Sequence, residues 1–185
     1  MKKYSKKKLP LDKTRSLLEP GPIVLVSSQW KDDRSIMTMG WHAMMGYEAI
    51  GCYIWDANFS HNLIKKSKQC VINLPEKHLL ETAIAIGNTT GADIDKFAEF
   101  GLTAEKGRKV QAPLIKECYA NFECEVIDTR LVNQFNFFVL QVVAAQSAIS
   151  PKYPETFHYR GSGVFMVSGE NIDRSKFFTP EMLDG

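Results

Sequence analysis

The chain has 185 residues, a hydrophobic fraction of 44% and a formal net charge of +2. This length allows one domain with a substantial core, and the composition excludes a disordered chain. A net charge so close to zero indicates neither nucleic acid nor an anionic membrane as a partner.

The first eight residues carry five lysines, at positions 2, 3, 6, 7 and 8. A basic arm is one interpretation, but no aromatic residues pattern the cluster for base stacking, so a solvated tail is favoured. We therefore expect residues 1–20 to be a basic tail and lead-in, and residues 21–185 to form a single domain. No apolar stretch follows the charged start, and no apolar run approaches the ~20 residues of a membrane helix. These patterns predict a soluble, cytoplasmic protein.

The next part of the chain is rich in strand-forming residues. A buried strand is predicted to open at Ile23–Val26, and the charged run Lys31–Arg34 is typical of a hairpin tip. The chain should return as a strand over Ser35–Trp41, and a third strand is predicted from Tyr47 to Trp55.

The middle of the chain changes to helical patterns. A helix is predicted from about Asn58 to Ser67, followed by a short buried strand over Gln69–Leu74. A second helix is predicted over Glu76–Ile86 and a third, short one over Asp93–Phe100.

Strands return in the last third. Cys118–Val126 alternates apolar and polar residues, which predicts a half-buried antiparallel strand. Phe135–Ser147 is apolar on both faces, so it needs a second cover, for which a subunit interface is a candidate. A final strand is predicted at Val164–Ser168. Strands, a helical insertion and strands again favour a mainly β fold with helices, an antiparallel Greek-key split β-barrel, over a doubly wound parallel sheet.

Several chemistries lack their usual signatures. The four cysteines form no Cys-x-x-Cys pair and are expected to be small, buried, reduced residues, and the four histidines are too scattered to predict a metal site. Dinucleotide-binding, phosphate-loop, metalloprotease and serine-hydrolase motifs do not occur.

One junction could hold an anion. The strand that ends at Trp55 leads directly into the helix that starts near Asn58, and backbone N–H groups at a helix start favour a phosphate. Asn58 and Ser60 add neutral donors there, and His61 could add charge. On these residues alone, simple helix capping by Asn58 or Ser60 remains the alternative interpretation.

The order of short motifs resembles the flavin reductase-like, FMN-binding split-barrel family, and within it the flavoredoxin branch. Each motif alone is weak, but together they keep the family's order over about two-thirds of the chain. They lie at residues 35–41 (SIMTMGW), 60–66 (SHNLIKK), 70–75 (CVINLP), 90–97 (TGADIDKF), 100–103 (FGLT), 110–113 (VQAP) and 121–126 (NFECEV).

The resemblance implies FMN bound in a groove between the two subunits of a homodimer. By the same resemblance, Thr38, Met39, Gly40 and Trp41 line the isoalloxazine ring, with Trp55 at the end of the next strand.

The remaining residues implied by the resemblance lie elsewhere in the groove. Ser60 is a phosphate ligand with Asn58 and His61 beside it, Asn73 lies next to the cofactor, and Lys96 reaches flavin or phosphate. Structural roles remain as alternatives: core packing for Met39 and Trp41, capping of a strand end for Asn73, and a surface charge for Lys96.

The chain departs from the family pattern at two points. Relatives commonly have an arginine just before the phosphate serine, whereas Trp55–Phe59 contains no cation and one acid, so phosphate binding must depend more on backbone amides, Ser60 and His61. Relatives also often have a Pro-Pro pair before the third strand, where this chain has Met44–Tyr47, so the loop beside the flavin should differ in shape.

Three functions are compatible with these observations. The first is an NAD(P)H-dependent flavin reductase, in which NAD(P)H binds transiently and electrons leave to an unidentified acceptor. The second is a flavoredoxin-type carrier that keeps FMN and shuttles electrons without significant free-flavin turnover. The third is a ligand-binding protein on the same barrel without redox function. In the first two the flavin supplies the redox chemistry, so no catalytic side chain is predicted.

Overall fold

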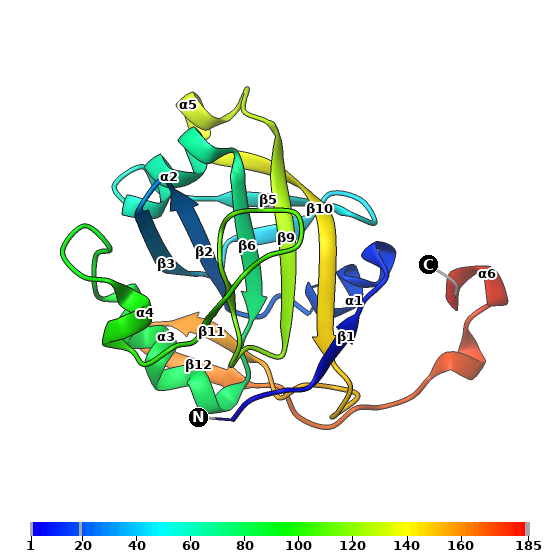
Figure 1. Ribbon diagram of the computed structural model, residues 1–185. Helices are drawn as coiled ribbons and strands as arrows, with labels where there is room; N and C mark the ends of the chain where they lie inside the picture. Colours follow the sequence, from blue (N-terminus) through cyan, green and yellow to red (C-terminus); the bar gives the residue numbers. More distant parts are fainter. Residues whose placement is uncertain (1, 19, 184–185) are drawn as a thin grey trace.

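The computed structural model describes residues 2–18 and 20–183, and it shows a curled antiparallel sheet with short helices packed around it (Figure 1). The strands are β1 (Lys6–Lys8), β2 (Val24–Trp30), β3 (Asp33–Met39), β4 (His42–Met44), β5 (Ala49–Tyr53), β6 (Gln69–Leu74), β7 (Ala104–Glu105), β8 (Leu114–Ile115), β9 (Ala120–Asp128), β10 (Phe137–Ala148), β11 (Phe157–Gly161) and β12 (Val164–Val167). The α-helices are α1 (Arg15–Leu18), α2 (Phe59–Ser67), α3 (Leu80–Gly87), α4 (Lys96–Glu99), α5 (Val132–Phe135) and α6 (Pro180–Leu183). Short 3-10 turns occupy Leu11–Lys13, Lys77–Leu79 and Ser175–Phe177.

The main sheet has the strand order β3-β2-β6-β9-β10-β5-β4, and β1 pairs with β10 outside this path. All of its pairings are antiparallel. The two edge strands, β3 and β4, are joined only by Gly40 and Trp41, and the Tyr53 N–H donates to the Trp41 carbonyl at 3.0 Å. The sheet therefore curls into a barrel that is split between β3 and the β4–β5 hairpin, which confirms the predicted fold class.

Strand β2 is buried on both faces because it separates two hydrophobic clusters. Val24 and Val26 belong to the cluster inside the barrel, with Phe122 and Phe138. Leu25 belongs to a second cluster that packs beneath α3 and α4 and includes residues of the β11–β12 hairpin. The helical insertion thus covers the outer face of β2 and β3, which places α3 and α4 beside the split in the barrel (Figure 1).

Most predicted elements are present, with three corrections. Strands β1, β4, β7, β8 and β11 and helices α1, α5 and α6 were not predicted. The third helix is shorter than expected because Asp95 caps it by accepting a hydrogen bond from the Phe97 N–H at 3.1 Å. On the expected polar face of β9, Glu125 is exposed but Asn121 and Glu123 are buried. Glu123 is buried there and accepts hydrogen bonds from the backbone N–H groups of residues 108, 109 and 110 at 3.0, 2.6 and 3.0 Å.

The N-terminal segment is not the solvated tail that its lysines predicted. Lys6–Lys8 form β1 and pair with the end of β10, and the Lys6 ammonium donates to the Asn121 side chain at 2.7 Å. The Tyr4 hydroxyl donates to the buried carboxylate of Glu76, which also pairs with Lys2. Backbone pairing and these buried partners explain why a strongly basic segment is ordered against the sheet.

Other expectations concern groups that could bind metals or lipid. The four cysteines are free and buried, as predicted. Within the described ranges, His, Cys, Asp and Glu side chains form no group of three or more that could hold a metal ion. None of the described helices combines the length and apolar character needed to cross a membrane.

Candidate binding groove along β3

Two adjoining hollows follow β3 and the split in the barrel, and together they form what we call the β3 groove. The closed end, of about 60 Å³, lies between α2 and the loop before α4, and the open slot, of about 220 Å³, lies between β3 and the end of β5. Met37 and Asn58 line both hollows, which places the two hollows next to each other.

The closed end includes the start of α2. Asn58 is the N-cap residue, yet its side chain makes no capping hydrogen bond, so helix capping does not account for its position. Ser60 lies in the first turn, is 1% exposed and lines the hollow. The His61 N–H donates to the Asn58 carbonyl at 3.0 Å. N–H groups at the very start of a helix have no helical acceptor, and together with the helix dipole they favour an anion at this point.

Lys96 supplies the positive charge at the closed end. Its side chain is buried rather than exposed beside Asp95, and its ammonium donates to the carbonyl oxygens of Ile86 at 2.8 Å and Thr89 at 2.7 Å. An ammonium has three donors, so one donor remains for a ligand in the hollow that Lys96 lines. Burial lowers the Lys96 pKa to about 8, because the charged form loses hydration.

Neighbouring contacts fix the position of Lys96. The Arg34 guanidinium donates to the Asp95 carboxylate at 3.2 and 2.5 Å and lies 4.8 Å from the centre of the Phe97 ring. Asp95 in turn caps α4, and the hydrogen bond from Arg34 is the main cause that lowers the Asp95 pKa. This chain of contacts holds the first turn of α4 against β3 before any ligand arrives.

Gly91 allows the loop to close over the groove. A Cβ added at Gly91 would lie 2.2 Å from the Ser35 hydroxyl oxygen and 2.8 Å from the Ser35 Cβ. Any larger residue would therefore push residues 89–91 away from β3 and widen the closed end.

The open slot differs in chemistry because aromatic side chains form its walls. The Trp41 ring lies 5.1 Å from the Tyr53 ring with an interplanar angle of 50°, and Trp55 stands at the end of β5. Trp41 is 68% exposed and Trp55 is 57% exposed. Large aromatic surfaces left open in this way are typical of a site that receives a flat apolar ligand or a partner.

The structure brings together most of the residues predicted for the site. They are Thr38, Met39, Gly40, Trp41, Trp55 and Asn58 in the open slot, and Asn58, Ser60 and Lys96 in the closed end. Two predicted residues, His61 and Asn73, line neither hollow.

His61 points toward the core. Its ring packs edge-on against Phe138 with centroids 5.2 Å apart, and its Nε2 atom is buried without a hydrogen-bond partner among the described residues. Burial, followed by the nearby Lys65 charge, lowers the His61 pKa, so the ring is neutral at pH 7. It therefore supplies no positive charge to an anion at the start of α2.

Asn73 lies in a buried polar cluster between β2, β6 and β8. Its amide nitrogen donates to the Leu25 carbonyl and the Ser27 hydroxyl at 3.0 Å, and its oxygen accepts from the Ile115 N–H at 3.0 Å and from Asn121 at 2.8 Å. With these partners Asn73 ties sheet strands together rather than facing the β3 groove.

Sequence reasoning missed several residues that line the groove. They are Ser35, Met37, Tyr53, Thr89 and Thr90. Ser35, Met37 and Thr90 lie within the recognised motifs, but no spacing rule separates groove-facing positions from core positions on a strand buried on both faces. Tyr53 could have been found from its two-residue spacing to Trp55, which places both side chains on one face of a strand.

The groove can accommodate a ligand with two distinct parts. The closed end offers helix N–H groups, a serine and a lysine, which suit a phosphate. The open slot offers flat aromatic walls, which suit a planar ring. A phosphorylated molecule with a planar ring system matches both parts.

Comparisons with known proteins agree with this geometry. Residues 16–165 match the family described as "flavin reductase like domain". An uncharacterized protein of Pyrococcus abyssi is 34% identical over 130 residues, which are 69% of this chain and 74% of that protein.

Solved structures with the same fold include two that share 21% identity with this chain. One is an FMN-binding domain of a flavin reductase-like enzyme from Shewanella baltica, with a TM-score of 0.86 over 94% of this chain and 99% of that one. The other is the flavoredoxin of Desulfovibrio vulgaris, with a TM-score of 0.76 over 84% of this chain and 90% of that one.

Proposed function

This chain belongs to the flavin reductase-like domain family, and we propose that it binds FMN in the β3 groove and transfers electrons through it from NAD(P)H to an acceptor. The observation that carries the proposal is that a small hollow lined by Ser60 and Lys96 adjoins an aromatic slot at Trp41, with Met37 and Asn58 lining both.

The residues present fit the parts of FMN. Ser60, Lys96 and the first turn of α2 would hold the phosphate, and the strand from Thr38 to Trp41 would line the isoalloxazine ring. Bound FMN supplies the redox chemistry, so the protein need only orient the ring and leave one face accessible. Lys96 takes the place of the arginine that the strand-to-helix turn lacks, because its ammonium approaches the same hollow from α4.

An absorption spectrum tests this proposal. The purified protein, incubated with FMN and desalted, should show flavin absorbance, and anaerobic NADH or NADPH should bleach it. Absence of flavin uptake would remove the proposal entirely, whereas uptake without bleaching would remove only the nicotinamide donor.

A flavoredoxin-type carrier is the second candidate, and it is favoured by the structural likeness to a flavoredoxin. The two candidates differ in turnover. A reductase should oxidise NADH continuously when free FMN is added, whereas a carrier should stop after its bound flavin is reduced.

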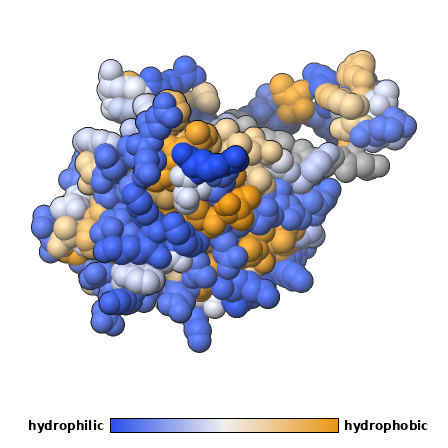
Figure 2. Space-filling model, turned by 90° about the horizontal axis from the view of Figure 1, so that it is seen from above, coloured by the Kyte–Doolittle hydropathy of each residue, from blue (hydrophilic) through white to orange (hydrophobic). Residues whose placement is uncertain are grey.

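We also propose that the protein acts as a homodimer through the outer face of β10. Phe137 packs over Gly51 of β5, where an added Cβ would be 2.3 Å from the tip of the phenyl ring, and Val139 follows on the same face. Ile127, Leu131 and Phe135 are exposed nearby. Figure 2, which looks down on the end that carries α5, shows apolar side chains gathered in the middle of a largely hydrophilic face.

Light scattering tests the homodimer. The wild-type protein should have twice the mass of one chain at micromolar concentration, and Val139→Asp should shift it toward the monomer because it buries a charge in the interface. Glu125→Asp, a conservative change on the neighbouring strand β9, is the control and should remain dimeric. A monomeric wild-type protein would contradict the proposal.

A further inference from the structure

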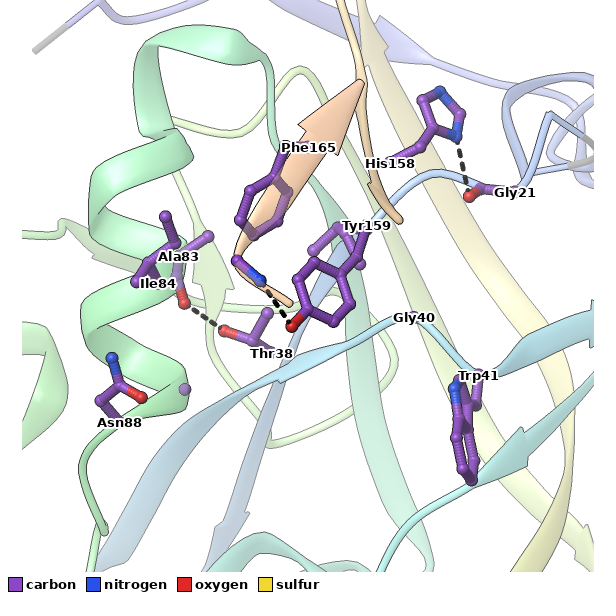
Figure 3. A pocket seen from close by; sticks show the side chains of 13 residues that line it. Gly21, Thr38, Gly40, Trp41, Ala83, Ile84, Asn88, His158, Tyr159 and Phe165 are labelled. Atoms are coloured by element: carbon purple, nitrogen blue, oxygen red, sulfur yellow. Dashed lines mark hydrogen bonds between the residues drawn. The ribbon is translucent and has the colours of Figure 1, made fainter. Parts of the chain in front are cut away.

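A cavity of about 580 Å³ lies beneath the β11–β12 hairpin, next to the β3 groove (Figure 3). Tyr159 and Phe165 from the hairpin form one wall, with ring centres 5.0 Å apart, and Ala83 and Ile84 from α3 form the opposite wall. We call it the hairpin cavity. Its volume falls within the range of about 300–1,000 Å³ that is typical of small-molecule sites.

The hairpin cavity is electrically neutral. Its lining contains no Asp, Glu, Lys or Arg, and its histidine is already engaged. The His158 ring contacts the Gly21 carbonyl through Nδ1 at 2.9 Å and the Thr156 hydroxyl through Nε2 at 3.2 Å. An ionic group or a pyrophosphate would therefore lose hydration in the cavity without gaining a charged partner.

A few neutral polar groups could orient a ligand. The Thr38 hydroxyl donates to the Ala83 carbonyl at 2.6 Å, which leaves its oxygen able to accept a hydrogen bond. The Asn88 amide lies at the end of α3 beside the cavity (Figure 3). Few polar groups among aromatic and aliphatic walls are typical of a site for a small, mostly apolar molecule.

We propose that the hairpin cavity binds an uncharged planar compound of one or two fused rings, separate from the flavin. The aromatic wall of Tyr159 and Phe165 suits a planar ring, the volume admits two fused rings, and the neutral lining selects against anions. The cavity shares Thr38, Gly40 and Trp41 with the open slot, so its occupant lies beside the ring end of the groove. Binding stands on the cavity alone, and a role for the ligand as the redox partner of the flavin rests on the proposed function.

Titration of flavin-free protein with 2-naphthamide, followed calorimetrically or by ligand-observed NMR, tests the proposal. The matched control ligand is 2-naphthoate, which has a similar shape and a negative charge. We expect a dissociation constant of ~0.1–1 mM for the amide, as is usual for a ligand of this size, and at least ~tenfold weaker binding of the carboxylate.

The variant Gly87→Leu fills the hairpin cavity without disturbing its walls. A Cβ at Gly87 would be 3.6 Å from the Thr38 Cβ, an ordinary contact, and leucine favours the helix more than glycine does. Glu81→Leu, at an exposed position of the same helix, is the matched control. Tyr159→Ala removes the Tyr159 half of the aromatic wall and serves as the second variant; Tyr159 is an exposed residue of the hairpin, so the change should not disturb the core.

Binding of 2-naphthamide should weaken by at least ~tenfold in both Gly87→Leu and Tyr159→Ala and stay unchanged in Glu81→Leu. The FMN affinity of all three variants should stay within ~twofold of the wild type. Equal binding of the two ligands, or no binding of the amide, would overturn the proposal. A parallel loss of FMN affinity in Gly87→Leu would also overturn it, because the flavin ring would then occupy this cavity. Failure of the wild type to bind FMN would instead overturn the proposed function.

Discussion

At the closed end of the β3 groove, Ser60 and Lys96 are almost entirely buried, whereas at the open end Trp41 and Trp55 keep 68% and 57% of their surface exposed. The closed end is assembled in advance, since Lys96 is held by two backbone carbonyls and α4 is held by Arg34. The open end keeps its aromatic walls accessible, and the proposed flavin and second subunit would cover them. The closed end should therefore determine the affinity for a charged group. The open end should tolerate variation in the ligand that lies against it.

Among substitutions in the two ends of the groove, a change at Lys96 should have the largest effect on the affinity for FMN. Lys96→Met keeps the aliphatic stem but removes the charge, and a hydrogen bond to a charged group contributes ~1.5–3 kcal/mol, or ~10- to 150-fold in the FMN dissociation constant. Riboflavin lacks the phosphate, so its affinity should stay within ~twofold, as measured by quenching of flavin fluorescence.

Lys66→Met is the matched control, because Lys66 is an exposed lysine in the last turn of α2. It should leave both flavins unaffected. An equal loss of affinity for FMN and for riboflavin in Lys96→Met would show that Lys96 only supports the loop through its hydrogen bonds to Ile86 and Thr89.

Substitution of Ser60 should have the next largest effect. Ser60→Ala removes one hydrogen bond to the phosphate and should weaken FMN binding by about tenfold, with little change in riboflavin binding. Calorimetric titration of both flavins measures this difference. If Ser60 only caps α2, the variant should instead lose ~1 kcal/mol of unfolding free energy and bind both flavins equally less well.

The affinity for FMN should depend on pH through Lys96. Its pKa of about 8 lies below that of a free lysine, so the ammonium is present below pH 8 and is lost above it in the ligand-free protein. Because the FMN phosphate is fully charged above its second pKa of about 6, affinity should be highest between the two values and fall by up to ~tenfold per pH unit above 8.

This pH dependence has an internal control. Riboflavin binding should not show the decline above pH 8, and Lys96→Met should abolish it for FMN. A decline that persists in Lys96→Met would assign the titration to another group.

Substitution at the open end of the groove should have the smallest effect on flavin affinity. Trp41→Ala removes one aromatic contact with the ring, which contributes ~0.5–1.5 kcal/mol and corresponds to ~2- to 12-fold in affinity. The loss should be equal for FMN and riboflavin, because both contain the same ring. A loss confined to FMN would reverse the assignment of the two ends.

Local patterns in the sequence were sufficient to predict most of the longer strands and the first helix. The pattern over Gln69–Leu74 predicted β6 with its observed bounds, and the charged run Lys31–Arg34 predicted the tip of the β2–β3 hairpin. These elements depend on alternation and turn residues, which act over a few positions.

The surroundings of Glu123, His61 and Asn73 could not be predicted from the sequence, because tertiary contacts determine them. Glu123 appeared to face solvent, but a loop more than ten residues away folds over it and satisfies its carboxylate. His61 follows Ser60 directly, yet successive helical residues point about 100° apart, so it packs against Phe138 instead of the groove. Asn73 belongs to a motif of the family, but its partners come from three separate segments.

Comparison of FMN with riboflavin on the wild-type protein tests the central claim most directly, because the two ligands differ only in the group assigned to the closed end. Isothermal titration at pH 7 should show both flavins binding, with FMN at least ~tenfold tighter. Equal affinities would contradict the phosphate assignment at Ser60 and Lys96, and binding of neither flavin would contradict the proposed function.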